Sequence, residues 1–263
     1  SRAPHQGHSI LSMLYDSTIP MSERYSFFAL ARHAVNGKLP WPRALQHPTL
    51  KKSYDAVIVG GGGHGLATAY FLAKEHGMKN VAVLERGVIG QGNSGRNTQV
   101  TRSDYFHLVS SKFFDRSLKL YEGLSRELNY NIMLSQRGKF SLVHSPHEME
   151  MARRTVNAIR MNGVDAEIVT ARELAKLEPM LNLDSRFPIE GAAVQWRGGI
   201  SRHDAVVWAF ARAAGRLGID IVQGCEVTGF AIEGGRVRGV ETTQGPVAAP
   251  RVLMAVAGHA SEL

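Results

Sequence analysis

Residues 54–65 read Tyr-Asp-Ala-Val-Ile-Val-Gly-Gly-Gly-Gly-His-Gly. Their first half is a short, nearly continuous apolar run, which is typical of a strand buried on both faces of a parallel sheet. The second half satisfies the pattern G-x-G-x-x-G and leads into a helix-forming segment, 66–75, which Gly77 ends. Residues 80–85 form a second apolar run. Strand, helix and strand together predict a βαβ unit with a right-handed crossover.

Three glycines and one acidic residue of this unit have separate roles in binding a dinucleotide. Gly60 permits the tight turn, Gly62 lets the backbone approach a pyrophosphate, and Gly65 lets helix and strand pack closely. The helix N-terminus presents free N–H groups and a partial positive charge to the phosphates. Glu85, which follows Gly65 by 20 residues, can accept hydrogen bonds from both hydroxyls of an adenosine ribose. The alternative is a tight turn without a ligand, which this context disfavours.

A second loop of small residues, 90–98, follows the second strand directly. It reads Gly-Gln-Gly-Asn-Ser-Gly-Arg-Asn-Thr and is expected over the carboxyl edge of the sheet, where the central part of a dinucleotide runs. Its polar side chains and Arg96 suit a flavin cofactor. NAD shares the first fingerprint and stays open as an alternative, and an ordinary surface loop is the other interpretation of this segment.

The composition excludes several classes of protein. With 263 residues, 44% of them hydrophobic, the chain can bury a core, which excludes disorder and collagen-like repeats. The single thiol, Cys225, excludes an internal disulfide and a cysteine-based zinc site. No apolar run approaches the roughly 20 residues that span a bilayer. We therefore expect a cytoplasmic protein with no membrane partner.

The net charge of +8 is unevenly distributed along the chain. Residues 1–52 hold seven Lys and Arg against two acidic residues, while residues 53–263 hold 24 against 21. Because a nucleic-acid binder would show a basic stripe across its folded body, we predict a basic N-terminal arm and no nucleic-acid partner. The histidines show no metal-ligand spacing with a third ligand, so no metal site is expected.

Periodicity and capping residues predict both helices and strands in the rest of the chain. Ser145 and Thr170 are predicted N-caps, because each is followed by Glu three residues later. One face of a long amphipathic helix is traced by Val109, Phe113, Leu120, Leu124 and Leu128. The other expected helices are 22–37 and 204–217, and the other expected strands are 139–144, 192–196, 219–223, 227–232, 237–242 and 252–257.

Three segments together resemble the glycine/sarcosine/D-amino acid branch of the FAD-dependent amine oxidoreductases, and within it the heterotetrameric type: Tyr54–Arg86, Gly92–Tyr105 and Gln136–Gly138. The resemblance runs from about Met21 to the end of the chain. It implies an α/β fold in which a Rossmann-like FAD-binding domain is interleaved with a mixed-sheet α+β substrate domain, in an N-terminal fragment whose C-terminal part is missing. The implied divisions are an arm at 1–52, FAD-binding parts at 53–105 and 201–263, and a substrate part at 106–200.

The resemblance also implies noncovalent FAD held by residues of both loops. Val227 would meet the adenine through its backbone, and Arg86 stands where relatives commonly have Lys. The run at 99–101, Gln-Val-Thr, replaces a more apolar run of the relatives. The implied FAD contacts are Gly60, Gly62, Gly63, His64, Gly65, Glu85, Arg86, Asn93, Arg96, Asn97, Thr98 and Val227.

Two further residues carry implied chemistry. From the sequence alone, Arg102 would be a surface or capping arginine and His203 an exposed histidine before a helix. In the amine oxidases that the chain resembles, an arginine at this position binds the substrate carboxylate through its fork of N–H donors. The heterotetrameric enzymes attach FMN covalently through a histidine in an Arg/Lys-His-Asp motif, here at 202–204. A neutral imidazole nitrogen can add to the flavin 8-methyl carbon, and a nearby carboxylate can orient the ring.

The implied reaction is the oxidative demethylation of sarcosine or a related secondary amine. Hydride passes from the amine to FAD, electrons pass to FMN on His203, and O2 is reduced to H2O2. Glycine and a one-carbon unit are the products, and other subunits of a hetero-oligomer are the partners. A single-flavin amino-acid or dimethylglycine-type oxidoreductase and a non-catalytic dinucleotide-binding scaffold subunit are the alternatives. We expect residues beyond Leu263 to complete the active site and this piece alone to be inactive.

Overall fold

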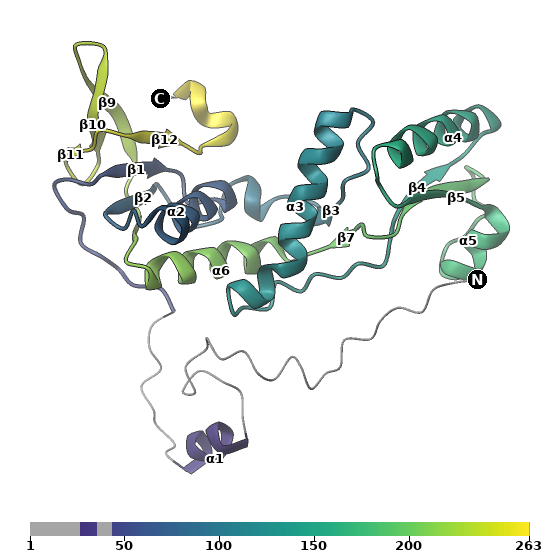
Figure 1. Cartoon of the computed structure of the whole chain (residues 1–263), viewed down its shortest axis with the longest axis horizontal. Helices are drawn as coiled ribbons and strands as arrows, with labels where there is room; N and C mark the ends of the chain where they lie inside the picture. Colours follow the sequence, from purple (N-terminus) through teal and green to yellow (C-terminus); the bar gives the residue numbers. More distant parts are fainter. Residues whose placement is uncertain (1–26, 36–43, 263) are drawn as a thin grey trace. The chain divides into compact units, whose positions relative to one another are not determined.

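The computed structural model describes residues 27–35 and 44–262 (Figure 1). These residues belong to two compact units, Ser1–Ala44 and Leu45–Leu263. Helix α1 (Phe27–Val35) lies in the first unit. The rest of the helix predicted over 22–37, and most of the predicted basic arm, lie outside the described residues. None of the helices in the described parts of the chain combines the length and the apolar content that a membrane crossing requires.

A four-stranded parallel sheet organises the second unit, in the order β12–β1–β2–β8. Val57 pairs with Ala82 on one side and with Val252 on the other. The two strands of the predicted βαβ unit are buried on both faces, as their continuous apolar sequences require. The predicted α/β class with a parallel sheet is therefore confirmed. The strands are β1 (Ala56–Val59), β2 (Val81–Glu85), β8 (Asp220–Gln223) and β12 (Val252–Met254).

Two helices, α2 (Gly63–His76) and α6 (His203–Arg216), cover one face of this sheet (Figure 1). They pack on each other through aromatic rings: the Phe210 centroid of α6 lies 5.7 Å from that of Tyr70 and 6.2 Å from that of Phe71, both in α2. Ala209, Ala211 and Ala214 of α6 are fully buried, so small side chains let the two helix backbones approach closely. Gly77 ends α2 as predicted, because at φ 65° it donates its N–H back to the Leu72 carbonyl.

The other face of the parallel sheet packs against a three-stranded antiparallel sheet, in the order β11–β10–β9. Its strands are β9 (Val227–Glu233), β10 (Arg236–Thr242) and β11 (Val247–Ala248). Val57 and Leu84 of the parallel sheet share one buried cluster with Val240 and Val247. The central sheet is therefore enclosed between two α-helices and a small β-layer, and its carboxyl edge is the place where open α/β sheets bind ligands.

A second antiparallel sheet, β4–β6–β5, carries helices α4 (Pro146–Met161) and α5 (Ala171–Leu177) (Figure 1). Its strands are β4 (Lys139–Val143), β5 (Ala166–Thr170) and β6 (Gly191–Gln195). Every pairing in this sheet is antiparallel. The predicted substrate part at 106–200 contains this sheet, and the predicted division of the chain at residues 105 and 200 stays a prediction.

Both predicted N-caps are present. Thr170 and Glu173 form a complete capping box at the start of α5. The Ser145 hydroxyl accepts the N–H of Glu148 at 3.2 Å, but the Glu148 carboxylate accepts the N–H of His144 at 2.7 Å, one residue before the cap. The Glu148 carboxylate therefore binds the N–H of His144 instead of the N–H of the cap residue, and both hydrogen bonds hold the start of α4.

Several short strands of the structure are not predicted from sequence periodicity. Strands β3 (Val100–Thr101), β7 (Gly199–Ile200) and β11 have two residues each, too few to show an alternation. Strand β5 runs directly into the Thr170 cap, so its pattern merges with the helix signal. The strand predicted over 252–257 is wrong in its second half, because Ala257 takes a positive φ of 51° and starts the 3-10 helix η4 (Ala257–Glu262).

Helix α3 (Leu108–Glu127) is present, but its predicted buried face is wrong in part. Val109 and Phe113 are 82% and 68% exposed, whereas Leu124 and Leu128 are buried. Near its start the helix instead buries the opposite side, through Ser111 and Leu118. Periodicity shows which residues share a face, and only the packing of the two helix ends shows which face is covered.

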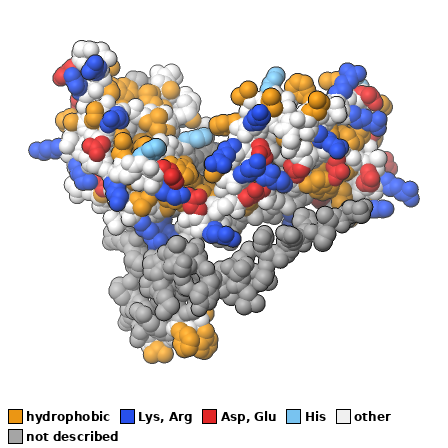
Figure 2. Space-filling view, in the orientation of Figure 1, with side chains coloured by type: hydrophobic (Ala, Val, Ile, Leu, Met, Phe, Trp, Pro, Cys, Tyr) orange, Lys and Arg blue, Asp and Glu red, His pale blue; other side chains and the backbone are white. Residues whose placement is uncertain are grey.

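Charged side chains of both signs are interspersed on the face of the molecule that Figure 2 shows. Several of the basic groups are paired across elements: Lys51 with Asp220 at 2.7 Å, Lys74 with Glu127 at 2.8 Å, and Arg197 with Glu122 at 2.9 Å. The nearly balanced charge of residues 53–263 is thus distributed over this face rather than gathered into a basic stripe.

Tyr54 links the segment before β1 to β8 through its phenol. The ring is 2% exposed, and the hydroxyl accepts the N–H of Lys51 and donates to Asp220, both at 3.0 Å. Burial raises the pKa of Tyr54 to about 12, the Lys51 N–H opposes this, and Asp220 adds to it. Since the folded-state pKa is raised, the stabilisation is complete below pH 10 and is lost as the pH rises through 12.

We predict that Tyr54→Phe lowers the free energy of unfolding by about 1–2 kcal/mol at pH 7, because two hydrogen bonds of the hydroxyl are lost. The variant should also flatten the fall of stability between pH 10 and 12. Urea unfolding at pH 7, 10, 11 and 12 measures both effects. An unchanged slope above pH 10 would contradict the assignment of the raised pKa to Tyr54.

Candidate functional site

The turn between β1 and α2 is built around two glycines. Gly60 has a φ of 108°, and a Cβ there would lie 2.6 Å from the Ala255 carbonyl oxygen. A Cβ on Gly65 would lie far inside van der Waals contact with the Gly60 carbonyl oxygen. Both positions therefore exclude any side chain, and the first turn of α2 begins directly at the carboxyl edge of the sheet, as predicted for a dinucleotide fingerprint.

The N-terminus of α2 meets the 90–98 loop. The N-cap residue Gly62 provides no side-chain cap, and the N–H of Gly63 donates instead to the Ser94 hydroxyl at 2.9 Å. His64 has an exposed side chain, and its carbonyl accepts the hydroxyl of Thr68. An oxygen acceptor thus already lies at a helix terminus whose partial positive charge favours anions. Ser94 is a site residue that sequence reasoning missed, although it lies inside the loop that the prediction singled out.

Glu85 lies at the end of β2 and faces the glycine turn. Its carboxylate accepts the N–H of Gly61 at 2.8 Å and that of Gly87 at 2.9 Å, one on each oxygen. A carboxylate has about four acceptor positions, so each oxygen retains one for a ligand hydroxyl. The neighbouring Arg86 is exposed. The predicted acid therefore holds both adjoining loops together and keeps the acceptors that a ribose needs.

A backbone hydrogen bond brings the segment of Val227 next to Glu85. The N–H of Cys225 donates to the Glu85 carbonyl at 2.9 Å, and Val227 follows two residues later as the buried first residue of β9. The structure thus brings the segment predicted to meet an adenine next to the acid predicted to bind its ribose.

The 90–98 loop holds itself in place through Asn97. Its amide donates to the carbonyls of Asn93 (3.3 Å) and Ser94 (3.0 Å), and its carbonyl oxygen accepts the N–H of Gln99 at 2.8 Å. The side chain of Asn97 is therefore occupied in shaping the loop. The side chains of Asn93, Arg96 and Thr98 are exposed.

These residues fit a dinucleotide at the carboxyl edge of the parallel sheet. Three features lie on adjoining segments. Gly60 and Gly65 leave no room for side chains, the N-cap residue Gly62 provides no side-chain cap to α2, and the Glu85 carboxylate has acceptor positions left for a ligand. Among residues 27–35 and 44–262, no group of three His, Cys, Asp or Glu side chains could hold a metal ion.

Arg102 lies beyond this edge, in a cluster of its own. Its guanidinium donates to Asp104 at 2.8 Å and lies over the ring of Tyr105, 4.4 Å from the centroid. The other Asp104 oxygen accepts Lys139 at 2.8 Å. Burial alone would lower the pKa of Arg102, but the hydrogen bond and charge of Asp104 outweigh it and raise that pKa. The arginine is fixed in a charged, half-buried state, with N–H donors beyond the one that Asp104 takes.

The Tyr105 ring is itself immobilised by Phe114 of α3. The two rings are stacked, with centroids 4.0 Å apart and planes inclined by 16°. The ring against which the Arg102 guanidinium packs is therefore itself held in place by an aromatic contact.

A two-residue ladder joins the Arg102 segment to the His203 segment. Val100 pairs with Ile200 and Thr101 with Gly199, while the N–H of Ser201 donates to the Gln99 carbonyl. Arg102 follows one strand of this pair, and His203 lies three residues after the other. The structure thus ties together the two segments that carry the predicted chemistry, although 101 positions separate them in the sequence.

His203 is the first residue of α6, and the expected orientation of its ring by the neighbouring carboxylate is wrong. Asp204 is instead held by Arg202, at 3.0 Å and 2.5 Å, and by the N–H of Ala205. The hydrogen bond from Arg202 is the main reason that the pKa of Asp204 is lowered. The Nδ1 atom of His203 is buried without a hydrogen-bond partner among the described residues. Arg202 outcompetes the imidazole because a guanidinium binds a carboxylate through two parallel donors.

Comparison with known proteins agrees with this geometry. The family model described as FAD dependent oxidoreductase matches residues 55–263. The chain is 48% identical over 241 residues to the sarcosine oxidase subunit beta of Rhodobacter capsulatus, covering 91% of this chain and 58% of that protein. It is 51% identical over 219 residues to the sarcosine oxidase subunit beta of an Arthrobacter species, covering 82% and 54%. The chain thus spans little more than half the length of these relatives.

The fold is similar to that of a solved structure as well. The L-proline dehydrogenase from P. horikoshii superposes with a TM-score of 0.75 at 26% sequence identity, over 81% of this chain and 55% of that one.

We predict that Gly65→Ala destabilises the protein by about 3 kcal/mol or more and abolishes retention of FAD, because its Cβ would collide with the Gly60 carbonyl. Gly123→Ala is the matched control, since Gly123 lies inside α3 with nothing within 4 Å of the added methyl. That control should raise stability by about 0.5–1 kcal/mol. Urea unfolding and the flavin absorbance that remains after gel filtration measure the two effects. Normal FAD retention by Gly65→Ala would contradict the close approach of strand and helix.

Proposed function

Because the chain belongs to the FAD-dependent oxidoreductase family, we propose that the whole protein binds FAD noncovalently and catalyses the oxidative demethylation of sarcosine or a related secondary amino acid. The observation that carries the proposal is the pairing of two sites. A dinucleotide edge formed by Gly60–Gly65 and Glu85 is joined through β3 and β7 to a positioned arginine, Arg102. The 48–51% identity to two sarcosine oxidase beta subunits supports the choice of amine.

The FAD contacts follow from the backbone groups and side chains of this edge. The N-terminus of α2, at Gly62 and Gly63, would bind the pyrophosphate, with the hydroxyl of Ser94 beside it. Glu85 would accept the ribose hydroxyls, and the backbone at Val227 would meet the adenine. The exposed side chains of the 90–98 loop would cover the middle of the cofactor. Bound FAD supplies the electron acceptor for the amine, and the protein supplies position and charge.

Arg102 would bind the carboxylate of the substrate. Its pKa is raised, so the guanidinium is charged at every physiological pH. Asp104 takes one of its donors, which holds the plane of the fork while the others face a ligand. The carboxylate would thereby fix the amine at one distance from the flavin-binding edge, which is the positioning that hydride transfer requires.

His203 would carry covalent FMN in the heterotetrameric type of enzyme, with O2 as the terminal acceptor and other subunits handling the one-carbon product. Its position at the start of α6, one ladder away from Arg102, supports a place beside the redox centre. With Nδ1 buried, attachment would use Nε2. FMN there would supply a second redox group.

A single-flavin amino-acid oxidoreductase is the second candidate. One observation favours it: Arg202 holds the Asp204 carboxylate, and Nδ1 of the His203 ring has no hydrogen-bond partner among the described residues. The FAD edge and Arg102 would function identically in both cases, so the two candidates differ only at His203.

We predict that Arg102→Met raises KM for sarcosine about 100-fold, because charge-assisted hydrogen bonds to a carboxylate are lost. Arg102→Lys should recover only part of the loss, since an ammonium keeps the charge without the fork. Steady-state kinetics of the full-length enzyme measure both variants. Arg153→Met is the matched control, because Arg153 is an exposed arginine of α4 that pairs only with Glu150 among the ion pairs observed. Equal KM values for all three variants would overturn the role of Arg102.

We predict that acid precipitation of the full-length protein leaves one flavin in the pellet and that His203→Asn releases it. Flavin fluorescence of pellet and supernatant measures the covalent fraction. If the wild-type pellet holds no flavin while sarcosine still bleaches the flavin absorbance of the native protein, the single-flavin candidate is selected. No bleaching of the flavin by any amino acid or secondary amine would overturn both candidates.

A further inference from the structure

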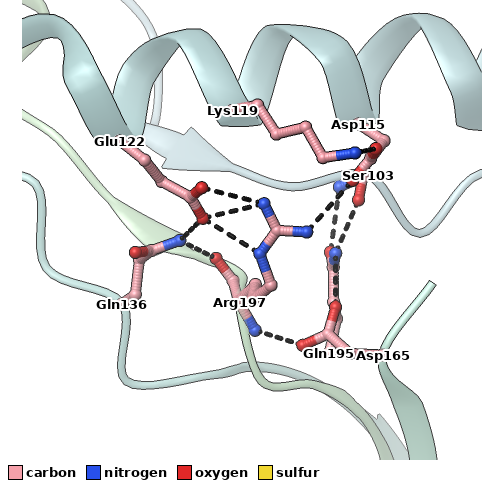
Figure 3. Close-up of polar contacts among 8 residues, drawn as sticks. All are labelled: Ser103, Asp115, Lys119, Glu122, Gln136, Asp165, Gln195 and Arg197. Carbon is pink, nitrogen blue, oxygen red and sulfur yellow. Dashed lines mark hydrogen bonds and ion pairs between the residues drawn. The ribbon is translucent and has the colours of Figure 1, made fainter. Parts of the chain in front are cut away.

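The buried side-chain amide of Gln195 holds the loop that carries Arg102. Ser103 and Gln195 are each 1% exposed. The Gln195 side-chain oxygen accepts the N–H of Ser103 at 2.9 Å, and its nitrogen donates to the Ser103 hydroxyl at 2.7 Å (Figure 3). The same nitrogen lies 3.4 Å from a carboxylate oxygen of Asp165. Every polar group of the Gln195 side chain is thus used, which makes the contact both strong and specific in direction.

Gln195 is held in turn from two elements. The other Asp165 oxygen accepts the N–H of Arg197 at 2.6 Å, at the end of β6. The guanidinium of Arg197 then bridges to α3, where it binds Asp115 at 3.1 Å and Glu122 at 2.9 Å (Figure 3). The amide of Gln195 therefore belongs to a network that spans β5, β6 and α3 and cannot turn by itself.

Ser103 stands between the two residues whose placement matters. Arg102 precedes it and Asp104 follows it, and these two pair with each other at 2.8 Å. Fixing the peptide of Ser103 consequently fixes the backbone from which the guanidinium starts and the carboxylate that holds it. Without Gln195, the buried N–H of Ser103 would lack its acceptor, and a buried donor left unsatisfied drives the backbone to shift.

We propose that Gln195 is a positioning residue for substrate binding: through Ser103 it sets the position at which Arg102 meets the substrate carboxylate. This inference rests on the proposed function of Arg102 as the carboxylate-binding group. Gln195 touches neither the substrate nor the flavin. Its effect is on affinity for the carboxylate and leaves the chemical step unchanged.

The test uses the full-length, FAD-loaded protein and three variants. Gln195→Met keeps the length of the side chain and removes all three hydrogen bonds. Ser103→Ala removes only the hydroxyl and keeps the N–H that donates to Gln195. Lys119→Met is the matched control, because it removes the peripheral Lys119–Asp115 ion pair of the same network and leaves Gln195 untouched.

Three measurements follow each variant: binding of acetate by titration of the flavin spectrum, KM and kcat for sarcosine, and amide hydrogen exchange over residues 102–106. For Gln195→Met we expect acetate affinity and 1/KM to fall about 10-fold, kcat to change less than about 3-fold, and exchange to be at least about 10-fold faster. Ser103→Ala should give about a 3-fold loss of affinity, and Lys119→Met no change.

The outcomes separate the two claims. If the wild type binds acetate through Arg102 while Gln195→Met retains both affinity and slow exchange, the positioning role is overturned and the proposed function stands. A fall in kcat equal to the rise in KM would also overturn it, because the residue would then act on the chemical step. If Arg102→Met binds acetate as well as the wild type does, the proposed function fails and the positioning role fails with it.

Discussion

The close approach of the α2 backbone to the end of β1 is the constraint on which the site depends. Because Gly65 has no side chain, the α2 backbone can lie against the Gly60 carbonyl, and the helix begins at the very edge of the sheet. The N–H of Gly63, the first residue of α2, then donates to Ser94, and the N–H of Gly61 donates to Glu85. The cofactor edge is consequently formed mainly by backbone atoms, and a single methyl group at position 65 would displace the elements on both sides of it.

The second constraint is the short ladder between β3 and β7. Two paired residues on each strand link the segment that leads from the 90–98 loop to Arg102 with the segment that leads into α6. So short a ladder is weak by itself, and buried polar contacts reinforce it on the side of the second sheet. Gln195 holds Ser103 there, while Arg197 ties the end of β6 to α3. The contacts that hold the Arg102 segment, where we propose that a substrate carboxylate binds, therefore also hold the fold together.

Local sequence predicted the elements that have one strong cause. The run at Ala56–Val59, the glycines after it and the cap at Thr170 each specify a structure within a few residues. Predictions failed where a distant partner decides. Val109 and Phe113 have the spacing of a core face and lie exposed, and Asp204 is adjacent to His203 yet binds Arg202. Periodicity shows which residues share a helix face, and adjacency shows which side chains can reach each other. Which face is buried depends on packing, and which hydrogen bond forms depends on the competing partners.

The sequence by itself determined the parallel-sheet fold, the glycine turn and the acid at its side, because each depends on steric limits and hydrogen bonds between neighbours in the chain. Only the tertiary structure decided that Ser94 meets the start of α2, that Gln195 supports Ser103, and that β3, which precedes Arg102, pairs with β7, which precedes His203. These contacts join residues 31 positions apart (Gly63 and Ser94), 92 apart (Ser103 and Gln195) and 100 apart (Val100 and Ile200). No local propensity encodes such contacts, since they exist only once the β-layers and α3 have packed around them.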